Sequence, residues 1–353
     1  MASLDLTQDV VSLTRALVDI ESVSGNERAI ADAVEHVLRA LPHLHVERDG
    51  DTVMARTDLG RSERVVLAGH LDTVPVNGNF PGRLDADRLV GLGSCDMKGG
   101  CAVILRTAAA LAEPNRDVTL FLYECEEVEA ERNGLKRLSR TRPEWFEADF
   151  AVLMEPTSAA VEGGCQGTMR VDVVARGVRA HSARAWMGDN AIHKAADILQ
   201  RLRDYEPRQP EVEGLTYHEG LNAVRIDGGV AGNVIPDEVR VCVNYRFAPD
   251  RSEVEALTFL RGFFDGYEVE VSDVAPAARP GLDRPVAAAF VEAIGSEPRP
   301  KLGWTDVARF TGLGVPAVNY GPGSPMMAHK QDEYVDLAEL RECEDRILAW
   351  LSA

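Results

Sequence analysis

Hydrophobic residues in the first half of the chain occur in two patterns, helical spacing and short unbroken runs. The segment "SVSGNERAIADAVEHVLRAL", residues 22–41, has apolar residues at helical spacing, and Ser24 and Glu27 form a capping-box pattern near its start. Apolar runs of strand length come next, at residues 64–69, 117–123 and 148–154. This alternation predicts an α/β fold with a mostly parallel central sheet flanked by helices.

The pattern changes near residue 170. Two segments alternate like half-buried strands, and the segment between them has the period of an amphipathic helix: "MRVDVVARG", "EVRVCVNYRF" and "NAIHKAADILQRLRDY". The α/β pattern then returns with the strand-like "GVPAVNY" and a closing helix near residues 337–351. We therefore predict a discontinuous first domain, residues 1–170 and 282–353, and a smaller inserted α+β domain, residues 171–281.

The composition is that of an ordinary globular protein, since 45% of its 353 residues are hydrophobic and 27% are charged. No apolar run approaches the roughly 20 residues that a membrane helix requires, and the N-terminal segment does not resemble a signal peptide. The six cysteines form no CxxC pair, which argues against a structural zinc module and fits a reducing compartment. We expect a cytoplasmic protein without membrane contact.

The formal net charge of −19 opposes binding to nucleic acid, because no long Lys/Arg block compensates for it. We therefore expect no nucleic-acid partner.

Acids and histidines come directly after the predicted strands. They are His70 and Asp72, Asp96 in a glycine-rich turn, Glu126 and Glu127, Glu155, and His329. In open α/β sheets, sites form beyond the carboxyl ends of the strands, where all these side chains would gather. For a single His–Asp pair, a strand end that enters solvent is the competing interpretation. Five separate segments that converge on one edge favour a site.

Two imidazoles with several carboxylates suit zinc or a similar first-row ion. Two dications carry about +4, which three coordinating carboxylates and a bridging hydroxide would nearly neutralise. The residues therefore favour a dinuclear site. The segment "GLGSCDMKGG" also begins like a nucleotide-binding turn, but Asp96 stands where the third glycine belongs and would repel a phosphate.

The chain resembles the zinc-dependent M20 family of amidohydrolases, aminoacylases and carboxypeptidases. The resemblance rests on motifs that span nearly the whole chain: "GHLDTVP", "GSCDMKGG", "CEEVE", "MEPT", "RAHSA", "NVIPD" and "AHKQDEYV". It implies two divalent metal ions, most commonly zinc, with cobalt or manganese as substitutes. Asp96 would bridge the ions. His70 and Glu155 would complete one metal site, and Glu127 and His329 the other.

The resemblance also implies amide hydrolysis by a metal-bound hydroxide. Asp72 would hydrogen-bond to His70, and Glu126, free of metal, would be the general base. His181 would stabilise the oxyanion from the partner subunit of a homodimer, which makes the inserted domain a lid and dimerisation domain.

Within this family, the segments "AHSARAWMGDNAIHKA", "GWTDVARF" and "AHKQDEYV" most resemble the bacterial succinyl-diaminopimelate desuccinylases. A substrate with several carboxylates fits the arginines of the inserted domain. The expected substrate-binding residues are Arg179, Asn233, Arg246, Gly323 and Ser324, the last two through backbone N–H groups. "ECEEVEA" and Cys165–Gln166 depart from many members of this branch, which affects substrate recognition more than metal chemistry.

Two alternatives remain open. Another deacylase, such as an acetylornithine deacetylase, or a dipeptidase or carboxypeptidase of the same family would share the metal site. An inactive metal-binding scaffold would have no need for Glu126.

Overall fold

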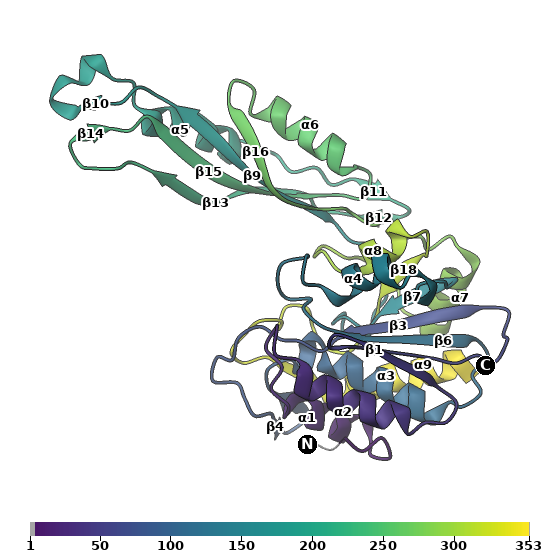
Figure 1. Cartoon of the computed structure of the whole chain (residues 1–353). Coiled ribbons are helices and arrows are strands. Elements are labelled where there is room, and N and C mark those ends of the chain that lie inside the picture. The colour runs from purple at the N-terminus through teal and green to yellow at the C-terminus, as the bar shows by residue number, and fades with distance from the viewer. Residues whose placement is uncertain (1–3, 353) are drawn as a thin grey trace. The chain divides into compact units, whose positions relative to one another are not determined.

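The computed structural model describes residues 4–352, which form two compact units (Figure 1). Unit 1 contains the described residues within Met1–Gly163, Pro280–Arg299 and Arg309–Ala353, and unit 2 contains Gly164–Arg279 and Pro300–Ala308. A search of the described residues finds no helix with the length and apolar character of a membrane span.

These boundaries differ from the predicted ones. Strand β9 (Gly167–Arg176) pairs along its whole length within the sheet of unit 2, so a boundary at residue 170 would divide it. The segment 300–308 also belongs to unit 2, where the Gln166 N–H donates to the Lys301 carbonyl at 3.2 Å. This return of the chain has no hydrophobic pattern of its own, which is why the sequence did not indicate it.

Unit 1 is built around an eight-stranded sheet. In spatial order its strands are β1 (His45–Asp49), β2 (Thr52–Arg56), β6 (Asp117–Tyr123), β3 (Arg64–His70), β7 (Phe150–Leu153), β18 (Ala317–Asn319), β8 (Glu162–Gly163) and β17 (Arg299–Pro300). The four central neighbours β6, β3, β7 and β18 are parallel to one another. All seven residues of β6 and six of the seven of β3 are buried, as expected for strands covered on both faces. The predicted α/β fold is confirmed.

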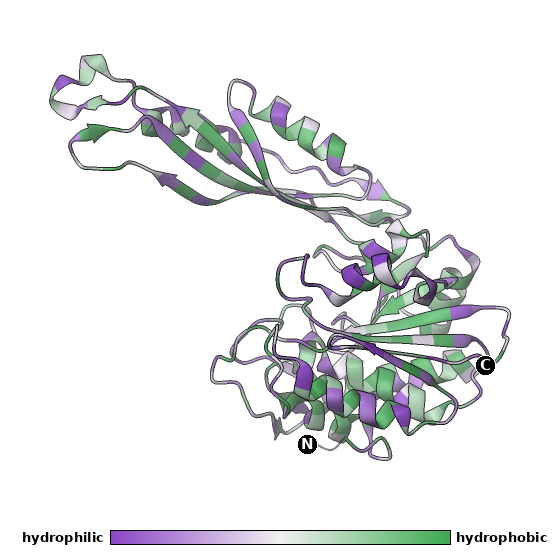
Figure 2. Cartoon of the chain, viewed as in Figure 1, coloured by the Kyte–Doolittle hydropathy of each residue, from purple (hydrophilic) through white to green (hydrophobic). Residues whose placement is uncertain are grey.

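Helices flank this sheet. They are α1 (Val10–Val18), α2 (Arg28–Arg39), α3 (Gly99–Ala110), α4 (Gly134–Thr141), α7 (Pro285–Ile294), α8 (Val307–Gly312) and α9 (Leu337–Ser352). Figure 1 shows α1, α2, α3 and α9 on one face, and Figure 2 shows the strands between the layers as largely hydrophobic. On the other face Phe121 of β6 packs against Phe146, with ring centroids 4.8 Å apart, and Phe146 packs against Phe310 of α8.

A small three-stranded sheet also contributes to unit 1. It pairs β19 (Tyr334–Asp336) with β5 (Arg88–Val90) and β5 with β4 (Arg83–Asp85). Two segments far apart in the sequence, one before residue 96 and one after residue 329, are thereby joined.

Unit 2 is an antiparallel sheet with helices, as the alternating pattern predicts. Its order is β13 (Gly220–Gly228), β15 (Glu238–Phe247), β9 and β16 (Glu268–Ala275). Helices α5 (Ala191–Arg203) and α6 (Glu253–Phe263) pack on it, and Val171, Ile198, Val241 and Leu260 are among the residues of their shared core. Two short ladders complete the unit: β10 (Ala180–His181) with β14 (Val234–Ile235), and β11 (Glu211–Val212) with β12 (Leu215–Thr216).

Candidate metal centre

The parallel strands of unit 1 bring the predicted site residues to one edge of the sheet. His70 is the last residue of β3, Glu126 and Glu127 come after β6, and Glu155 comes after β7. His329 lies in the loop between β18 and β19. Because these strands are adjacent and parallel, their carboxyl ends lie together, where sites of open α/β sheets form.

Asp96 reaches the same edge from the segment Ser94–Lys98, which precedes α3 and in which Asp96 itself has non-helical φ −119° and ψ 94°. Ligand atoms of His70, Asp96 and Glu127 all lie within 4.8 Å of one another. His70 Nε2 lies 3.1 Å from Asp96 Oδ1, and His329 Nε2 lies 3.4 Å from Asp96 Oδ2. His329 Nε2 also lies 2.8 Å from Glu127 Oε1.

The electrostatics of this cluster favour positive charge between its carboxylates. Hydrogen bonds to Asp96 and Glu127 raise the pKa of His329 to about 10. Burial opposes charging of His70, but Asp96 and Asp72 raise its pKa well above the ordinary value. Burial likewise opposes ionisation of Asp96, yet its hydrogen bonds with His329 and His70 leave its pKa below the ordinary range. The carboxylates thus favour positive charge at the two imidazoles, as they would favour a bound cation.

The donor set fits divalent metal ions of the zinc type. The two oxygens of Asp96 face different histidines, which is the arrangement that a carboxylate bridging two ions requires. Glu127 and His329 lie on one side of it. Glu155 is 5% exposed beyond β7 but is not a member of the three-residue group, so its role as a ligand stays a prediction.

Asp72 is completely buried and makes different contacts from those expected. Its backbone carbonyl lies 3.0 Å from His70 Nδ1, whereas its carboxylate Oδ1 lies 3.5 Å from that nitrogen. The acceptor closest to His70 Nδ1 is therefore the Asp72 carbonyl and not the expected carboxylate. With a metal ion bound, a neutral His70 would donate through Nδ1 to this carbonyl and offer its Nε2 lone pair to the metal.

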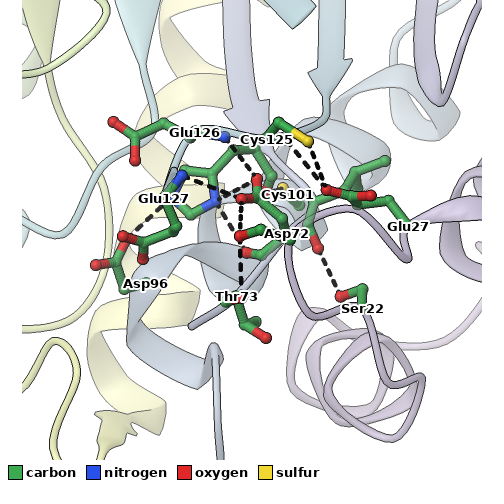
Figure 3. Close-up of polar contacts among 12 residues, drawn as sticks. Ser22, Glu27, Asp72, Thr73, Asp96, Cys101, Cys125, Glu126 and Glu127 are labelled. Atoms are coloured by element: carbon green, nitrogen blue, oxygen red, sulfur yellow. Dashed lines mark hydrogen bonds and ion pairs between the residues drawn. The ribbon is translucent and has the colours of Figure 1, made fainter. Parts of the chain in front are cut away.

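The Asp72 carboxylate instead accepts backbone N–H groups from Glu126 at 3.0 Å and Glu127 at 3.1 Å (Figure 3). These two glutamates lie beyond the end of β6 in a bend rather than in an extended strand. The Asp72 carboxylate therefore holds both residues of this bend through their backbone.

Glu333 is a supporting residue that the sequence analysis missed. Its carboxylate, 1% exposed, accepts N–H groups from Gly93, Cys95 and Asp96 at 2.9–3.1 Å. Burial raises its pKa to about 7, against the effect of those three donors. Glu333 thus fixes the turn that carries Asp96. The only signal was its place in "AHKQDEYV", four residues after His329.

His181 lies in unit 2 and is exposed. The Ala183 N–H donates to His181 Nδ1 at 3.0 Å, so the neutral ring carries its proton on Nε2. That nitrogen is a hydrogen-bond donor, as stabilisation of an oxyanion requires.

The other predicted substrate residues of unit 2 differ in their contacts. Arg179 donates twice to Asp237 Oδ1, at 2.8 and 3.0 Å, so its guanidinium is already paired. Arg246 is partly buried, and no ion pair with it is found among residues 4–352. Burial and the nearby Arg170 lower its pKa. The Asn233 carbonyl accepts the Ser182 N–H at 2.9 Å.

Gly323 does not offer the free N–H that was expected. Its N–H donates to Glu339 Oε2 at 2.7 Å, so a carboxylate of α9 already occupies the position of the anion. Gly323 has φ +93°, and a Cβ there would lie 2.8 Å from Cys95 Sγ, so close packing explains the glycine. The Ser324 carbonyl accepts from Cys95 Sγ at 3.1 Å, and binding of substrate by Ser324 stays a prediction.

Comparison with known proteins identifies the family of the chain. Residues 66–352 match the model of peptidase family M20/M25/M40, and the chain belongs to this family. It is 53% identical over 99% of both chains to a Mycobacterium tuberculosis protein provisionally named succinyl-diaminopimelate desuccinylase DapE. It is also 46% identical to the succinyl-diaminopimelate desuccinylase of Corynebacterium glutamicum, over 99% of this chain and 98% of the relative.

Solved structures share the fold. Aminopeptidase PepT of Bacillus cereus has a TM-score of 0.79 at 19% identity, over 99% of this chain and 98% of that one. The YXEP protein of Bacillus subtilis is described as a dinuclear metal-binding peptidase of the M20 family. It has a TM-score of 0.71 at 16% identity, over 97% of this chain and 96% of that one. Both similarities extend through both units.

Proposed function

We propose that the protein hydrolyses the amide bond of N-succinyl-LL-2,6-diaminopimelate to give succinate and LL-2,6-diaminopimelate, a step toward lysine and peptidoglycan precursors. The observation that carries this proposal is the 46–53% identity, over nearly the whole chain, to proteins named for that activity. The convergence of His70, Asp96 and Glu127 on one edge of the sheet supports the hydrolytic chemistry.

Two divalent metal ions, zinc in the first instance, would be held by the predicted ligand set: His70, Asp96, Glu127, Glu155 and His329. Bound there, such ions supply a Lewis acid and lower the pKa of water. Asp96 would bridge them through the two oxygens that face His70 and His329. Asp72, through its carbonyl, orients His70 for this task.

Glu126 is the general base of the proposed reaction. It accepts a proton from the attacking water and passes that proton to the leaving amine. Its neighbour Glu127 contacts His329 and belongs to the three-residue group with His70 and Asp96, which supports a ligand role for Glu127. The proposal therefore gives the two adjacent glutamates separate roles.

His181 donates from Nε2 to the oxyanion of the tetrahedral intermediate, and we propose that it does so from the partner subunit of a homodimer. Strand β13 supports such pairing, because it is an edge of its sheet and exposes Val224 and Ile226. Arg246 would bind a substrate carboxylate. We place the enzyme in the cytoplasm, because six cysteines without a CxxC pair fit a reducing compartment.

The test is a steady-state assay of zinc-loaded protein on N-succinyl-LL-diaminopimelate, N-acetylornithine and a dipeptide panel. We expect kcat/KM to be at least about 100-fold higher for the succinyl substrate, about 2.7 kcal/mol of transition-state discrimination. Preference for another substrate would overturn the specificity and keep the hydrolase. No turnover of any substrate, with metal measured in the protein, would support an inactive scaffold.

A further inference from the structure

Three consecutive backbone N–H groups around the proposed base donate to two buried carboxylates (Figure 3). Cys125 donates to Glu27 Oε1 at 3.2 Å, Glu126 to Asp72 Oδ1 at 3.0 Å, and Glu127 to Asp72 Oδ2 at 3.1 Å. The position of the segment 125–127 is therefore set by carboxylates from two other parts of the chain.

Glu27 makes contacts that a helix cap does not explain. It is the N-cap of α2, yet its side chain does not cap that helix. Instead Oε1 accepts the Gly25 N–H at 2.8 Å, the Cys125 N–H, and the Cys125 thiol at 3.3 Å. The residue is 1% exposed, and a carboxylate buried to this degree needs such donors. The capping box predicted from Ser24 and Glu27 is therefore wrong.

Ser24 completes the same arrangement. Its hydroxyl donates to Asp72 Oδ2 at 2.7 Å, and its backbone N–H donates to the Thr73 carbonyl at 3.0 Å. The connection between α1 and α2 therefore acts on the 125–127 amides in two ways. It supplies the Glu27 carboxylate, which accepts the Cys125 N–H, and through Ser24 it binds the Asp72 carboxylate, which accepts the other two.

The backbone conformation shows why this segment needs support. Cys125 has φ +56°, in the left-handed region that non-glycine residues rarely adopt. Such a conformation persists where surrounding contacts determine it. The hydrogen bond from Cys125 to Glu27 is made at that residue, directly before Glu126.

We propose that Ser24 and Glu27 are positioning residues that fix the location of Glu126 relative to the reacting amide. This inference rests on the proposed function, because it takes Glu126 as the general base. A misplacement of about 1 Å can cost about 100-fold in rate. Loss of Glu27 should thus lower kcat while the metals and the binding of substrate remain.

The test compares Glu27→Ala, Glu27→Gln and Ser24→Ala with Glu21→Gln, an exposed acid in the same connection. Each variant is assayed on the substrate that the wild-type enzyme turns over fastest, so the proposed function is tested separately by the wild type. We expect Glu27→Ala to lower kcat about 10- to 100-fold, with KM within about threefold and metal equivalents unchanged. Glu27→Gln keeps an acceptor oxygen and should restore most of kcat, and Ser24→Ala should give a smaller loss.

A double-mutant cycle decides whether Glu27 acts through Glu126. In a Glu126→Gln background, Glu27→Ala should lower kcat by less than about threefold, because the group that it positions is gone. Equal losses in both backgrounds would overturn the proposal. So would a wild-type kcat for Glu27→Ala, or a loss of kcat that parallels the loss of bound metal or of folded protein in circular dichroism.

Discussion

At the scale of single residues, neighbouring acids of the site differ in what surrounds them. Glu127 lies 2.8 Å from His329 and within the group of His70 and Asp96. Asp72 uses both carboxylate oxygens to accept backbone N–H groups of Glu126 and Glu127, so its carboxylate holds this segment in place. This division leaves Glu126 as the acid to which proton transfer is best assigned.

Replacement of Glu126 by glutamine tests that assignment. Glutamine keeps the size of the side chain but cannot accept the proton, so kcat should fall about 10²- to 10⁴-fold. Metal equivalents, measured by mass spectrometry, should stay at the wild-type value. The matched control is Glu129→Gln, an exposed acid three residues away. Retained activity would exclude Glu126 as the base, and joint loss of metal and activity would make it a ligand.

Replacement of Arg246 by methionine tests substrate binding. Arg246 is partly buried and its pKa is lowered by burial and by Arg170, so its charge is costly for the free protein. A hydrogen-bonded substrate carboxylate would offset that cost by about 1.5–3 kcal/mol. We expect kcat/KM to fall about 10- to 150-fold, mainly through KM, while Tm stays the same or rises.

The control for Arg246 is Arg203→Met, an exposed arginine at the end of α5. A fall in Tm for Arg246→Met, with KM unchanged, would show that the guanidinium stabilises unit 2 and does not bind substrate.

At the scale of secondary-structure elements, the sequence predicted the features that depend on hydrophobic periodicity and on the adjacency of strands. The buried runs around β3, β6 and β7 are visible as apolar stretches, and polar residues directly after them identify the edge of the sheet. The supporting carboxylates have no such signal. Glu27 accepts a backbone N–H from a residue 98 positions away, and Glu333 accepts one from a residue 238 positions away. Because a backbone N–H is present at nearly every position, no residue type in the sequence identifies these partners.

The same limit explains the error at Gly323. A glycine-rich turn indicates backbone N–H groups, but the sequence does not reveal that Glu339, sixteen residues later, already accepts one. A turn motif predicts a set of donors. Only the fold determines which donors remain for a ligand.

The loop before β3 supplies a prediction for pH-dependent stability. Asp117, 4% exposed at the start of β6, accepts hydrogen bonds at 2.8 Å from Thr57 Oγ1 and from the Leu59 and Arg61 N–H groups. Burial raises its pKa, but these donors outweigh burial and lower it overall. Because the folded pKa is below the unfolded one, this stabilisation is complete above about pH 4 and is lost as pH falls through the folded pKa.

Asp117→Asn should therefore lower the free energy of unfolding by about 1–3 kcal/mol at pH 7, and the difference from wild type should shrink below about pH 4. Urea unfolding of both proteins at a series of pH values, with equal metal content, measures this difference in the free energy of unfolding. Asp58→Asn, an exposed acid in the same loop, is the control. If the difference in the free energy of unfolding did not change with pH, the shape of the Asp117 side chain and not its charge would account for the stabilisation.

At the scale of the whole molecule, the proposed catalytic groups are divided between the two units. Unit 1 contains the metal ligands and Glu126, and unit 2 contains His181 and Arg246. Neither unit has the full set, so the way in which they are combined, within one chain or between two, determines what a single chain can do.

Mixed dimers distinguish these two cases. Glu126→Gln and His181→Ala are each expected to be nearly inactive alone. If His181 acts on the partner's site, a dimer with one copy of each variant has one site with an intact Glu126 and an intact His181, and should recover about half of the wild-type kcat per dimer. If His181 acts within its own chain, every site carries one defect and no activity returns. Two affinity tags isolate the mixed dimer, and a mixed dimer of Glu126→Gln with Glu126→Ala, which restores no site in either case, gives the background.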